Sequence, residues 1–337
     1  MRPIVKTTLM ASRALPVILV LALALAFAHA IAFAEANRPA VPPLSIEPGK
    51  VTLLDIEQVG HSLVVVGERG IVGRSDDGGQ SWQLRQAPTS RTLTSLAFVN
   101  DKVGVTVGHG GTILRTEDGG ATWVAVPIKD IGRDAVLGVT ALKNGHLVAY
   151  GAFGMYLVSE DQGKSWRRHP VVEDNFERHI SRVVETSHGL FLVGETGIVA
   201  RSVDGGTKWT QLKSPYEGSY FGLLEVKGGA LLAFGMRGNI YRSSDEGNTW
   251  ERVPFASKAT INGGSLSPDG RVVLAGNRGL LAISSDDGRT FSILAAPEGT
   301  SLSQAQLLAD GTAVYTGVMA TGRMQTSPAA QAHAQSK

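Results

Sequence analysis

Six aspartates recur at a regular spacing, and a carboxylate can bind a cation or hold a turn together. They are Asp77, Asp118, Asp161, Asp204, Asp245 and Asp286. Each stands five residues before an aromatic residue, and these residues are Trp82, Trp123, Trp166, Trp209, Trp250 and Phe291. One carboxylate per repeat falls far short of the roughly six to eight oxygen ligands that Ca²⁺ takes. An Asp followed by Gly instead accepts hydrogen bonds from its own turn, so we expect a structural role.

A repeated structural unit must position these aspartates, because the aromatic residues are 41, 43, 43, 41 and 41 residues apart. Each repeat has an apolar run such as 63–66, a G-x-x-G turn, a second short run, and the phrase S-x-D-x-G-x-[ST]-W. Short β-branched runs bounded by turn residues are typical of buried strands, and four strands per 41–43 residues make one blade of a β-propeller. The sequence predicts an all-β fold with six complete blades from about 51 to 296.

Residues 301–326 predict three more strands that lack both the Asp phrase and a closing strand. A circular propeller must pair its first and last blades or leave a sheet edge exposed. We therefore expect seven four-stranded antiparallel blades, with Leu44-Ser45-Ile46 supplying the outer strand of the last one. A ring of six blades with the C-terminal strands appended is the alternative.

The G-x-x-G turns differ from blade to blade, and they are expected on the face opposite the Asp phrases. Arg and aromatic side chains there have the composition of interface hot spots. Arg69, Arg237 and Arg278 share one turn position and could form a basic arc near the mouth of the central channel. The predicted partner-binding residues are Arg69, Arg237, Arg278, His109, Glu68, Glu195, Arg91, Arg178 and Tyr220.

A second set of arginines stands three residues before the box aspartates: Arg74, Arg115, Arg201 and Arg242. Their regular recurrence indicates packing along a strand and pairing with a neighbouring carboxylate. We interpret this second set as structural.

The N-terminal region has the features of a secretory signal peptide, with a basic leader, an apolar run from 14 to 27 and small-x-small sites ending at Ala34. The predicted domains are a signal peptide (1–34), an extended segment with the closing strand (35–50), the propeller (51–326) and a disordered tail (327–337). A retained N-terminal anchor is the alternative to cleavage. Export would place the protein in the periplasm or another extracytoplasmic compartment.

The charge and cysteine counts exclude several classes of function. The chain has no cysteine, which excludes disulfides, thiol nucleophiles and thiolate metal sites. Without the leader, 29 basic residues stand against 30 acidic ones, so nothing indicates binding to nucleic acid. The histidines have no partner at ligand spacing, and no phosphate-binding loop or G-x-S-x-G elbow occurs. We predict no metal, no cofactor, and a protein that is monomeric by itself.

The phrase S-x-D-x-G-x-T-W resembles the Asp-box, or BNR repeat, of sialidases and several non-enzymatic propellers. The longer cadence, from the G-x-x-G turn to the aromatic residue, is most similar to the photosystem II assembly/stability factor family, over about 44–322. Departures are Lys208 in place of Ser/Thr in the fourth box and Phe291 in place of Trp in the sixth. The resemblance implies a non-catalytic propeller that docks on a membrane protein or envelope complex.

A sialidase-like glycosidase is the enzymatic alternative, because sialidases share the box. It would need an arginine clamp for a carboxylate, a Tyr nucleophile with a Glu partner, and an acid. Tyr216 and Tyr220 with Glu217 are the nearest candidates, and the family's Arg-Ile-Pro entry motif has no counterpart after residue 34. A glycan-binding propeller is a third possibility, favoured if aromatics line a sugar-sized groove.

Overall fold

The fold was analysed in a computed structural model, which describes residues 43–128, 131–172, 176–297 and 299–326. The predicted signal peptide (1–34), the first half of the extended segment (35–42) and the predicted tail (327–337) lie outside these residues. Within the described ranges, no helix has the length and apolar character needed to cross a membrane.

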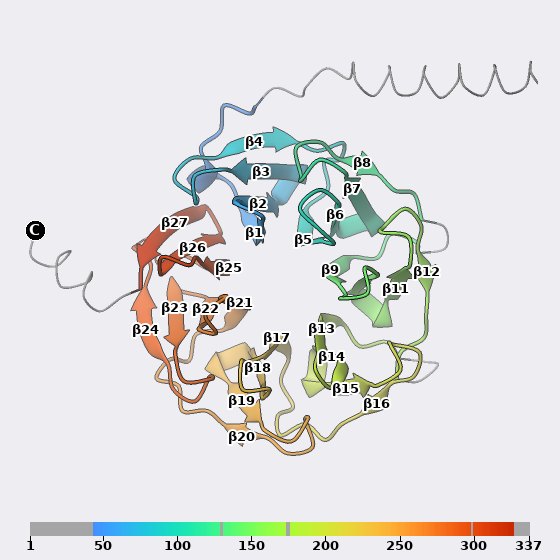
Figure 1. Cartoon of the computed structure of the whole chain (residues 1–337), viewed down its shortest axis with the longest axis vertical. Coiled ribbons are helices and arrows are strands. Elements are labelled where there is room, and N and C mark those ends of the chain that lie inside the picture. Colours follow the sequence, from blue (N-terminus) through green and yellow to red (C-terminus); the bar gives the residue numbers. More distant parts are fainter. Residues whose placement is uncertain (1–42, 129–130, 173–175, 298, 327–337) are drawn as a thin grey trace, which may run out of the picture. The chain divides into compact units, whose positions relative to one another are not determined.

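Residues 53–325 form seven antiparallel sheets arranged as the blades of a ring (Figure 1). The innermost strands are β1 (Leu53–Val59), β5 (Leu93–Phe98), β9 (Val136–Ala141), β13 (Ile180–Thr186), β17 (Tyr220–Glu225), β21 (Ile261–Leu266) and β25 (Leu302–Leu307). The second strands are β2 (Ser62–Gly67), β6 (Gly104–Gly108), β10 (Leu147–Gly151), β14 (Gly189–Gly194), β18 (Leu231–Gly235), β22 (Val272–Gly276) and β26 (Thr312–Gly317).

The third strands are β3 (Ile71–Ser75), β7 (Thr112–Thr116), β11 (Tyr156–Ser159), β15 (Val199–Ser202), β19 (Ile240–Ser243), β23 (Leu280–Ser284) and β27 (Ala320–Gln325). The outer strands are β4 (Gln83–Gln86), β8 (Val124–Ala125), β12 (Arg167–Arg168), β16 (Thr210–Gln211), β20 (Glu251–Arg252) and β24 (Ser292–Ala295). Within each blade, consecutive strands are neighbours, which confirms the predicted seven-bladed propeller.

The hydrophobic core lies between adjacent blades. The second strand of each blade is buried on both faces, which explains why runs such as Val64, Val65 and Val66 are continuously apolar. One cluster joins Val64 and Leu114 to Trp123, so the box aromatic of blade 2 packs against blade 1. Hence no blade has a core of its own, and the ring is the folding unit.

Each G-x-x-G turn lies between the second and third strands of its blade, and the first five fold as 3₁₀ turns. These turns are η2 (Glu68–Gly70), η3 (His109–Gly111), η4 (Ala152–Gly154), η5 (Glu195–Gly197) and η6 (Met236–Gly238). The last glycine of a turn has a positive φ, and at Gly154 a Cβ would lie 1.9 Å from the carbonyl oxygen of Phe176. Glycine is therefore required by both conformation and space.

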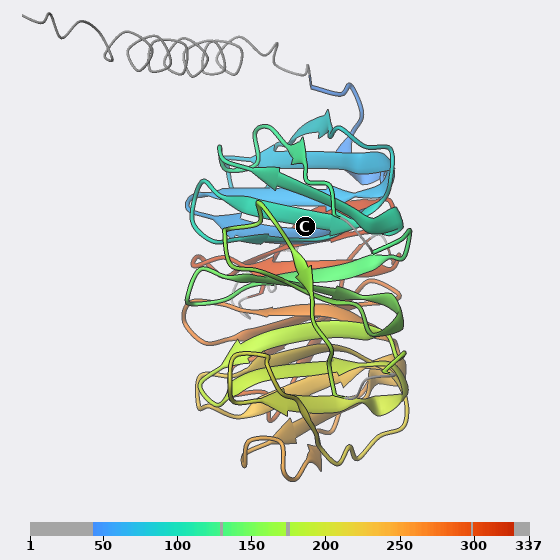
Figure 2. The same cartoon turned by 90° about the vertical axis from the view of Figure 1, so that its right-hand side faces the viewer.

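The turns of the blades lie on the two sides of the ring, as Figure 2 shows edge-on. The Asp-boxes join third to outer strands and therefore share one side with the turns that join first to second strands. The 3₁₀ turns and the blade-to-blade connections share the other side. We call these the Asp-box face and the hairpin face.

Closure of the ring differs from the prediction. The seventh sheet has three strands, and Leu44 does not supply a fourth: its N–H donates to the carbonyl of Leu84 in β4, at 2.7 Å. The Leu44 side chain also packs against the hydrophobic cluster of Leu53, Leu84 and Val314, which stabilises this position. The N-terminal segment meets blade 7 as a 3₁₀ turn, η1 (Pro48–Lys50), whose Pro48 carbonyl accepts from the Thr321 hydroxyl.

Inner-strand contacts complete the closure. The side-chain amide of Gln306 in β25 donates to the carbonyl of Ile56 in β1, at 3.0 Å. Similar bonds join other neighbours, such as Thr140 Oγ1 to the Val183 carbonyl at 2.7 Å. The first and last blades are thus joined as the others are, by their inner strands.

Candidate functional site

The Asp-box aspartates bond their own turns. Asp118 accepts hydrogen bonds from the Thr122 N–H at 2.8 Å, the Thr122 hydroxyl at 2.6 Å and the Thr116 hydroxyl at 2.7 Å. At Asp161, burial opposes ionisation, but the bonds from Ser165 and Ser159 outweigh it and lower the pKa to about 2. These carboxylates are occupied, which supports their predicted structural role.

The two boxes that depart from the pattern lose a part of it. Asp204 accepts hydrogen bonds from the Lys208 N–H and from the Ser202 hydroxyl. Lys208 has no hydroxyl, so the bond that Thr122 donates to Asp118 has no counterpart there. Phe291 has no ring N–H, and it packs edge-on against Phe255 at 5.8 Å. Trp123, by contrast, donates from Nε1 to the Gly120 carbonyl at 3.1 Å.

The second set of arginines joins neighbouring blades on the Asp-box face. Arg74 donates to the carbonyl of Gly119, in the box of the next blade, at 2.8 Å, and Arg242 donates to that of Asp287 at 3.0 Å. Arg115 bonds Gln162 in the same way, and Arg201 pairs with Glu246 at 2.8 Å. This arrangement agrees with the structural interpretation and adds that the arginines connect blades.

The tips of the hairpin face share one backbone conformation and differ in side chain. In the seven blades, the tip residue with positive φ is Arg69, Gly110, Phe153, Thr196, Arg237, Arg278 and Met319. Phe153 is 54% exposed and Met319 57% exposed, values that are high for apolar side chains. The hairpin face therefore offers basic and apolar groups to solvent together.

Most of the predicted partner-binding residues lie on this face. Arg69, His109, Arg237, Arg278, Arg91 and Arg178 are exposed, and Glu68 and Glu195 are partly so. Among the described residues, no carboxylate oxygen lies within 4.0 Å of the guanidinium groups of Arg69, Arg237 or Arg278. The predicted arc is not continuous, since the apolar tip of blade 7 stands between Arg278 and Arg69.

Two predicted residues have another role. Tyr220 is fully buried between Tyr216 and Tyr241, so it cannot contact a partner directly. Its position at the start of an inner strand, packed by the neighbouring turn, is the physical reason. Glu195 accepts from the backbone N–H of His179 at 3.2 Å, and it therefore also holds a connection in place.

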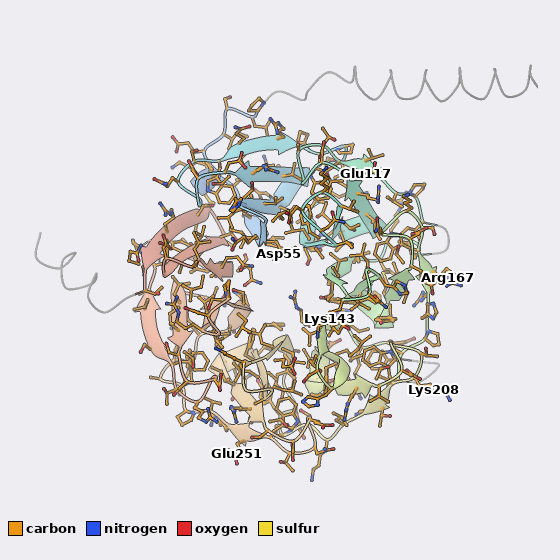
Figure 3. The ribbon with its side chains drawn as sticks, viewed as in Figure 1. Asp55, Glu117, Lys143, Arg167, Lys208 and Glu251 are labelled. Atoms are coloured by element: carbon orange, nitrogen blue, oxygen red, sulfur yellow. The ribbon has the colours of Figure 1, made fainter. Side chains whose placement is uncertain are left out.

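A polar channel runs through the ring along the inner strands. Its hairpin-face mouth is a cavity of about 430 Å³ with His179, Glu195 and Phe221 in its wall. Towards the Asp-box face lies a second cavity of about 320 Å³, lined by Asp55, Glu57 and Arg182. Figure 3 shows Asp55 at the inner edge of blade 1, whereas Arg167, Lys208 and Glu251 lie on the outer rim.

The charged groups deeper in this channel, Asp55, Glu57 and Arg182, escaped the sequence analysis. Asp55 accepts from the Ser95 hydroxyl at 2.8 Å and from the Leu96 N–H at 3.0 Å, which joins blades 1 and 2. Burial and the nearby Asp55 raise the pKa of Glu57 to about 8. Alternation of Asp55 and Glu57 along an inner strand was the signal, since period two places both on one side.

The candidate glycosidase residues do not form a catalytic set. Tyr220 is enclosed, and burial raises its pKa, which is opposite to the activation of a nucleophile. Of the candidate arginines, Arg237 lines a pocket with Tyr216 and Glu217, whereas Arg69 and Arg278 lie at the tips of other blades. In the part of the chain that the structure describes, no three His, Asp or Glu side chains are grouped to hold a metal ion.

Known proteins resemble this chain in sequence and in fold. Residues 44–167 match the family model described as Photosynthesis system II assembly factor YCF48. No curated protein sequence matches the chain. The solved structure of YCF48 bound to D1 peptide has a TM-score of 0.68 at 21% identity, and the alignment covers 86% of this chain and 100% of that one.

Two further structures show how widely the fold occurs. YCF48 from Cyanidioschyzon merolae has a TM-score of 0.64 at 19% identity, with 83% of this chain and 97% of that chain covered. Selenomethionine-substituted virginiamycin B lyase from Staphylococcus aureus has a TM-score of 0.69 at 14% identity, with 82% and 94% covered. At these identities, structural similarity establishes the fold and not the activity. Together with the family match, it identifies the chain as a β-propeller like the photosystem II assembly factors.

Proposed function

We propose that this protein is a non-catalytic accessory propeller that binds an exported segment of a membrane protein or envelope complex through its hairpin face. It would act there as an assembly or stability factor. The predicted signal peptide supports export to the periplasm, and the family match supports a client in or at the membrane. In a related propeller, YCF48, a D1 peptide is bound.

The observation that carries this proposal is the contrast between a repeated backbone and variable tips. Arg69, Arg237 and Arg278 have no ion-pair partner among the described residues, and Phe153 and Met319 expose more than half of their side chains. A rigid ring lowers the entropic cost of association, because the contacting side chains are already held in place. Exposed apolar groups beside unpaired arginines are the composition of an interface.

The test is in-cell crosslinking of the tagged protein, followed by solubilisation of membranes and mass spectrometry. We expect one membrane complex to be recovered in stoichiometric amount. Joint replacement Arg69→Glu, Arg237→Glu and Arg278→Glu should reduce this recovery by about tenfold or more, as for a charged interface whose attraction becomes repulsion.

A matched control changes the charge equally on the outer strands, with Arg85→Glu, Arg168→Glu and Arg252→Glu. This control should fold and recover the complex as the wild type does. Equal recovery by the hairpin-face variant, with its fold intact, would refute the proposal. If only abundant envelope proteins were recovered, glycosidase and glycan-binding assays would follow.

A further inference from the structure

A pocket opens on the hairpin face between blades 4 and 5. It has a volume of about 450 Å³ and is lined by Pro215, Tyr216, Glu217, Gly218, Met236 and Arg237. The first four residues belong to the connection from β16 to β17, and the last two to the turn η6. We call this cavity the tyrosine pocket. Its walls combine apolar and aromatic side chains with one charge of each sign.

The tyrosine pocket is preformed. The ring of Tyr216 stacks on that of Tyr241, with centroids 5.8 Å apart and planes at 29°. The Ser214 hydroxyl donates to the Tyr216 carbonyl at 2.8 Å, and the Tyr216 hydroxyl donates to the Met236 carbonyl at 3.4 Å. A Cβ on Gly218 would lie 2.1 Å from the Tyr216 hydroxyl oxygen, so glycine permits this approach. Little reorganisation is needed before a ligand group enters.

The pocket is suited to one apolar side chain. Met236 is 36% exposed although it is apolar, and methionine adapts its shape to the group it meets. Tyrosine adds a large contact area at a low cost in side-chain entropy. These are the features of an anchor site that buries a single side chain of a partner.

The charged side chains around the pocket determine which residue of a partner is favoured beside that apolar side chain. On the side of blade 6, the positive side chains of Arg237, Lys258 and Arg278 follow one another along the hairpin face, and all three are exposed. Lys258 lies beside the turn, since a Cβ on Gly238 would be 3.3 Å from its Cα. Glu217 is the acidic group on the opposite rim. An acidic residue is therefore favoured on the blade 6 side and an apolar one in the pocket.

We propose that the tyrosine pocket receives an apolar side chain from an extended segment of the client protein, with an acidic residue within three positions directed towards Arg237 and Arg278. This inference rests on the proposed function, because it assumes that the hairpin face binds a protein client. It adds the chemistry of the recognised segment and the place where it is anchored.

The experiment uses a photo-reactive amino acid, p-benzoylphenylalanine, at three exposed tips in separate full-length proteins: in place of Met236, Met319 or Arg69. The crosslinked client peptides are then sequenced by mass spectrometry. We expect position 236 to capture a single segment with a large apolar residue followed or preceded, within three positions, by Asp or Glu. A captured segment without this pair would overturn the inference.

The three positions separate the two proposals. Capture of the client from 319 or 69, but not from 236, would overturn the tyrosine pocket and leave the proposed function intact. Capture from none of them would overturn the proposed function itself. Met236→Asp and Met319→Asp provide the matched pair of variants, since both residues are exposed and neither supports the core.

Affinity then tests the chemistry with the captured segment as a labelled synthetic peptide. Met236→Asp should weaken binding by about tenfold, and Met319→Asp by less than about threefold. Replacing the acidic residue of the peptide by its amide should weaken binding to the wild type more than binding to the double variant Arg237→Gln, Arg278→Gln. Equal effects on both proteins would show that these two arginines do not read this charge, and would overturn that part of the inference. Met236→Gln serves as a second variant should the aspartate impair folding.

Discussion

On the Asp-box face, each of six turns bonds its aspartate through a backbone N–H and the preceding hydroxyl, and five of them add a second hydroxyl. On the hairpin face, seven turns repeat one backbone conformation but carry different side chains. The box residues after each aspartate also have positive φ, and there the carbonyls of Gln162 and Asp287 accept an arginine from the preceding blade. On the hairpin face, Arg69, Phe153 and Arg237 adopt the same region with their side chains in solvent. Residues with positive φ thus hold neighbouring blades together on the Asp-box face, and on the hairpin face they present side chains to solvent.

Glycine would be the least costly residue at each hairpin tip. A left-handed conformation costs a non-glycine residue roughly 1–2 kcal/mol, yet Gly110 is the single glycine at the tip position. Side chains kept at strained positions suggest that selection acts on the groups they present. The predictions below test this division of roles between the two faces.

The largest difference should come from deleting one aromatic side chain on each face. Trp123 is 7% exposed and packs edge-on against Phe98, so Trp123→Ala should lower the free energy of unfolding by about 3–5 kcal/mol. Phe153→Ala, which removes a side chain that is 54% exposed, should change it by less than about 0.5 kcal/mol. Denaturant unfolding measures both, and similar losses would break the comparison.

Arginines of blade 1 give a smaller and more specific contrast. Arg74 donates to Gly119, to Asp76 and to Ser62, whereas Arg69 has no ion-pair partner among the described residues. Arg74→Gln should therefore cost about 1–2 kcal/mol of stability and leave client recovery unchanged. Arg69→Gln should have the opposite pattern, with stability unchanged and recovery reduced. The same two proteins answer both questions, and a reduced recovery by Arg74→Gln alone would reverse the assignment of the faces.

The repeats explain how much of this could be predicted from the sequence. The repeated phrase predicts six blades, the order of their strands and the role of Asp77 to Asp286, because its turn chemistry is local. The seventh blade was predicted from the need to close the ring. The partner of Leu44 could not be predicted in this way. Leu44 could pair with blade 1 or with blade 7, which are distant in sequence, and in the structure its N–H donates to the Leu84 carbonyl of blade 1. A strand-like segment cannot indicate which of two edges it will meet.

Burial and charge in the finished ring were also beyond the sequence. Tyr220 follows an exposed-looking Gly- and Ser-rich connection, but Tyr216 and Tyr241 enclose it once blades 4 and 5 meet. The channel charges combine blade 1 with blade 4, since Arg182 lies in β13 and Asp55 and Glu57 lie in β1. Glu57 and Arg182 are about 125 positions apart, and no rule of sequence spacing links residues at that separation. They line one cavity because the closed ring brings their inner strands to the same channel.

The last test, with the smallest expected effect, concerns the acidic pair Asp55 and Glu57 in the channel. This pair lies towards the Asp-box face. Burial, together with Asp55, raises the pKa of Glu57 from an ordinary value of 4.5 to about 8, and Phe98 N–H and Arg182 oppose this shift. The folded protein therefore binds a proton between these pH values that the unfolded chain has released. Glu57 accordingly makes the free energy of unfolding fall as the pH rises from about 4.5 to about 8.

Glu57→Gln removes this titration and keeps an oxygen that can accept from the Phe98 N–H. Because Glu57 is partly exposed to the channel, we expect a modest gain, about 1 kcal/mol over the wild type at pH 9, that vanishes at pH 5. Thermal or denaturant unfolding at both pH values measures the difference. Since the pair lies away from the hairpin face, client recovery should be the same for both proteins at pH 7; a change in recovery would mean that the channel takes part in binding and that the two faces are not independent.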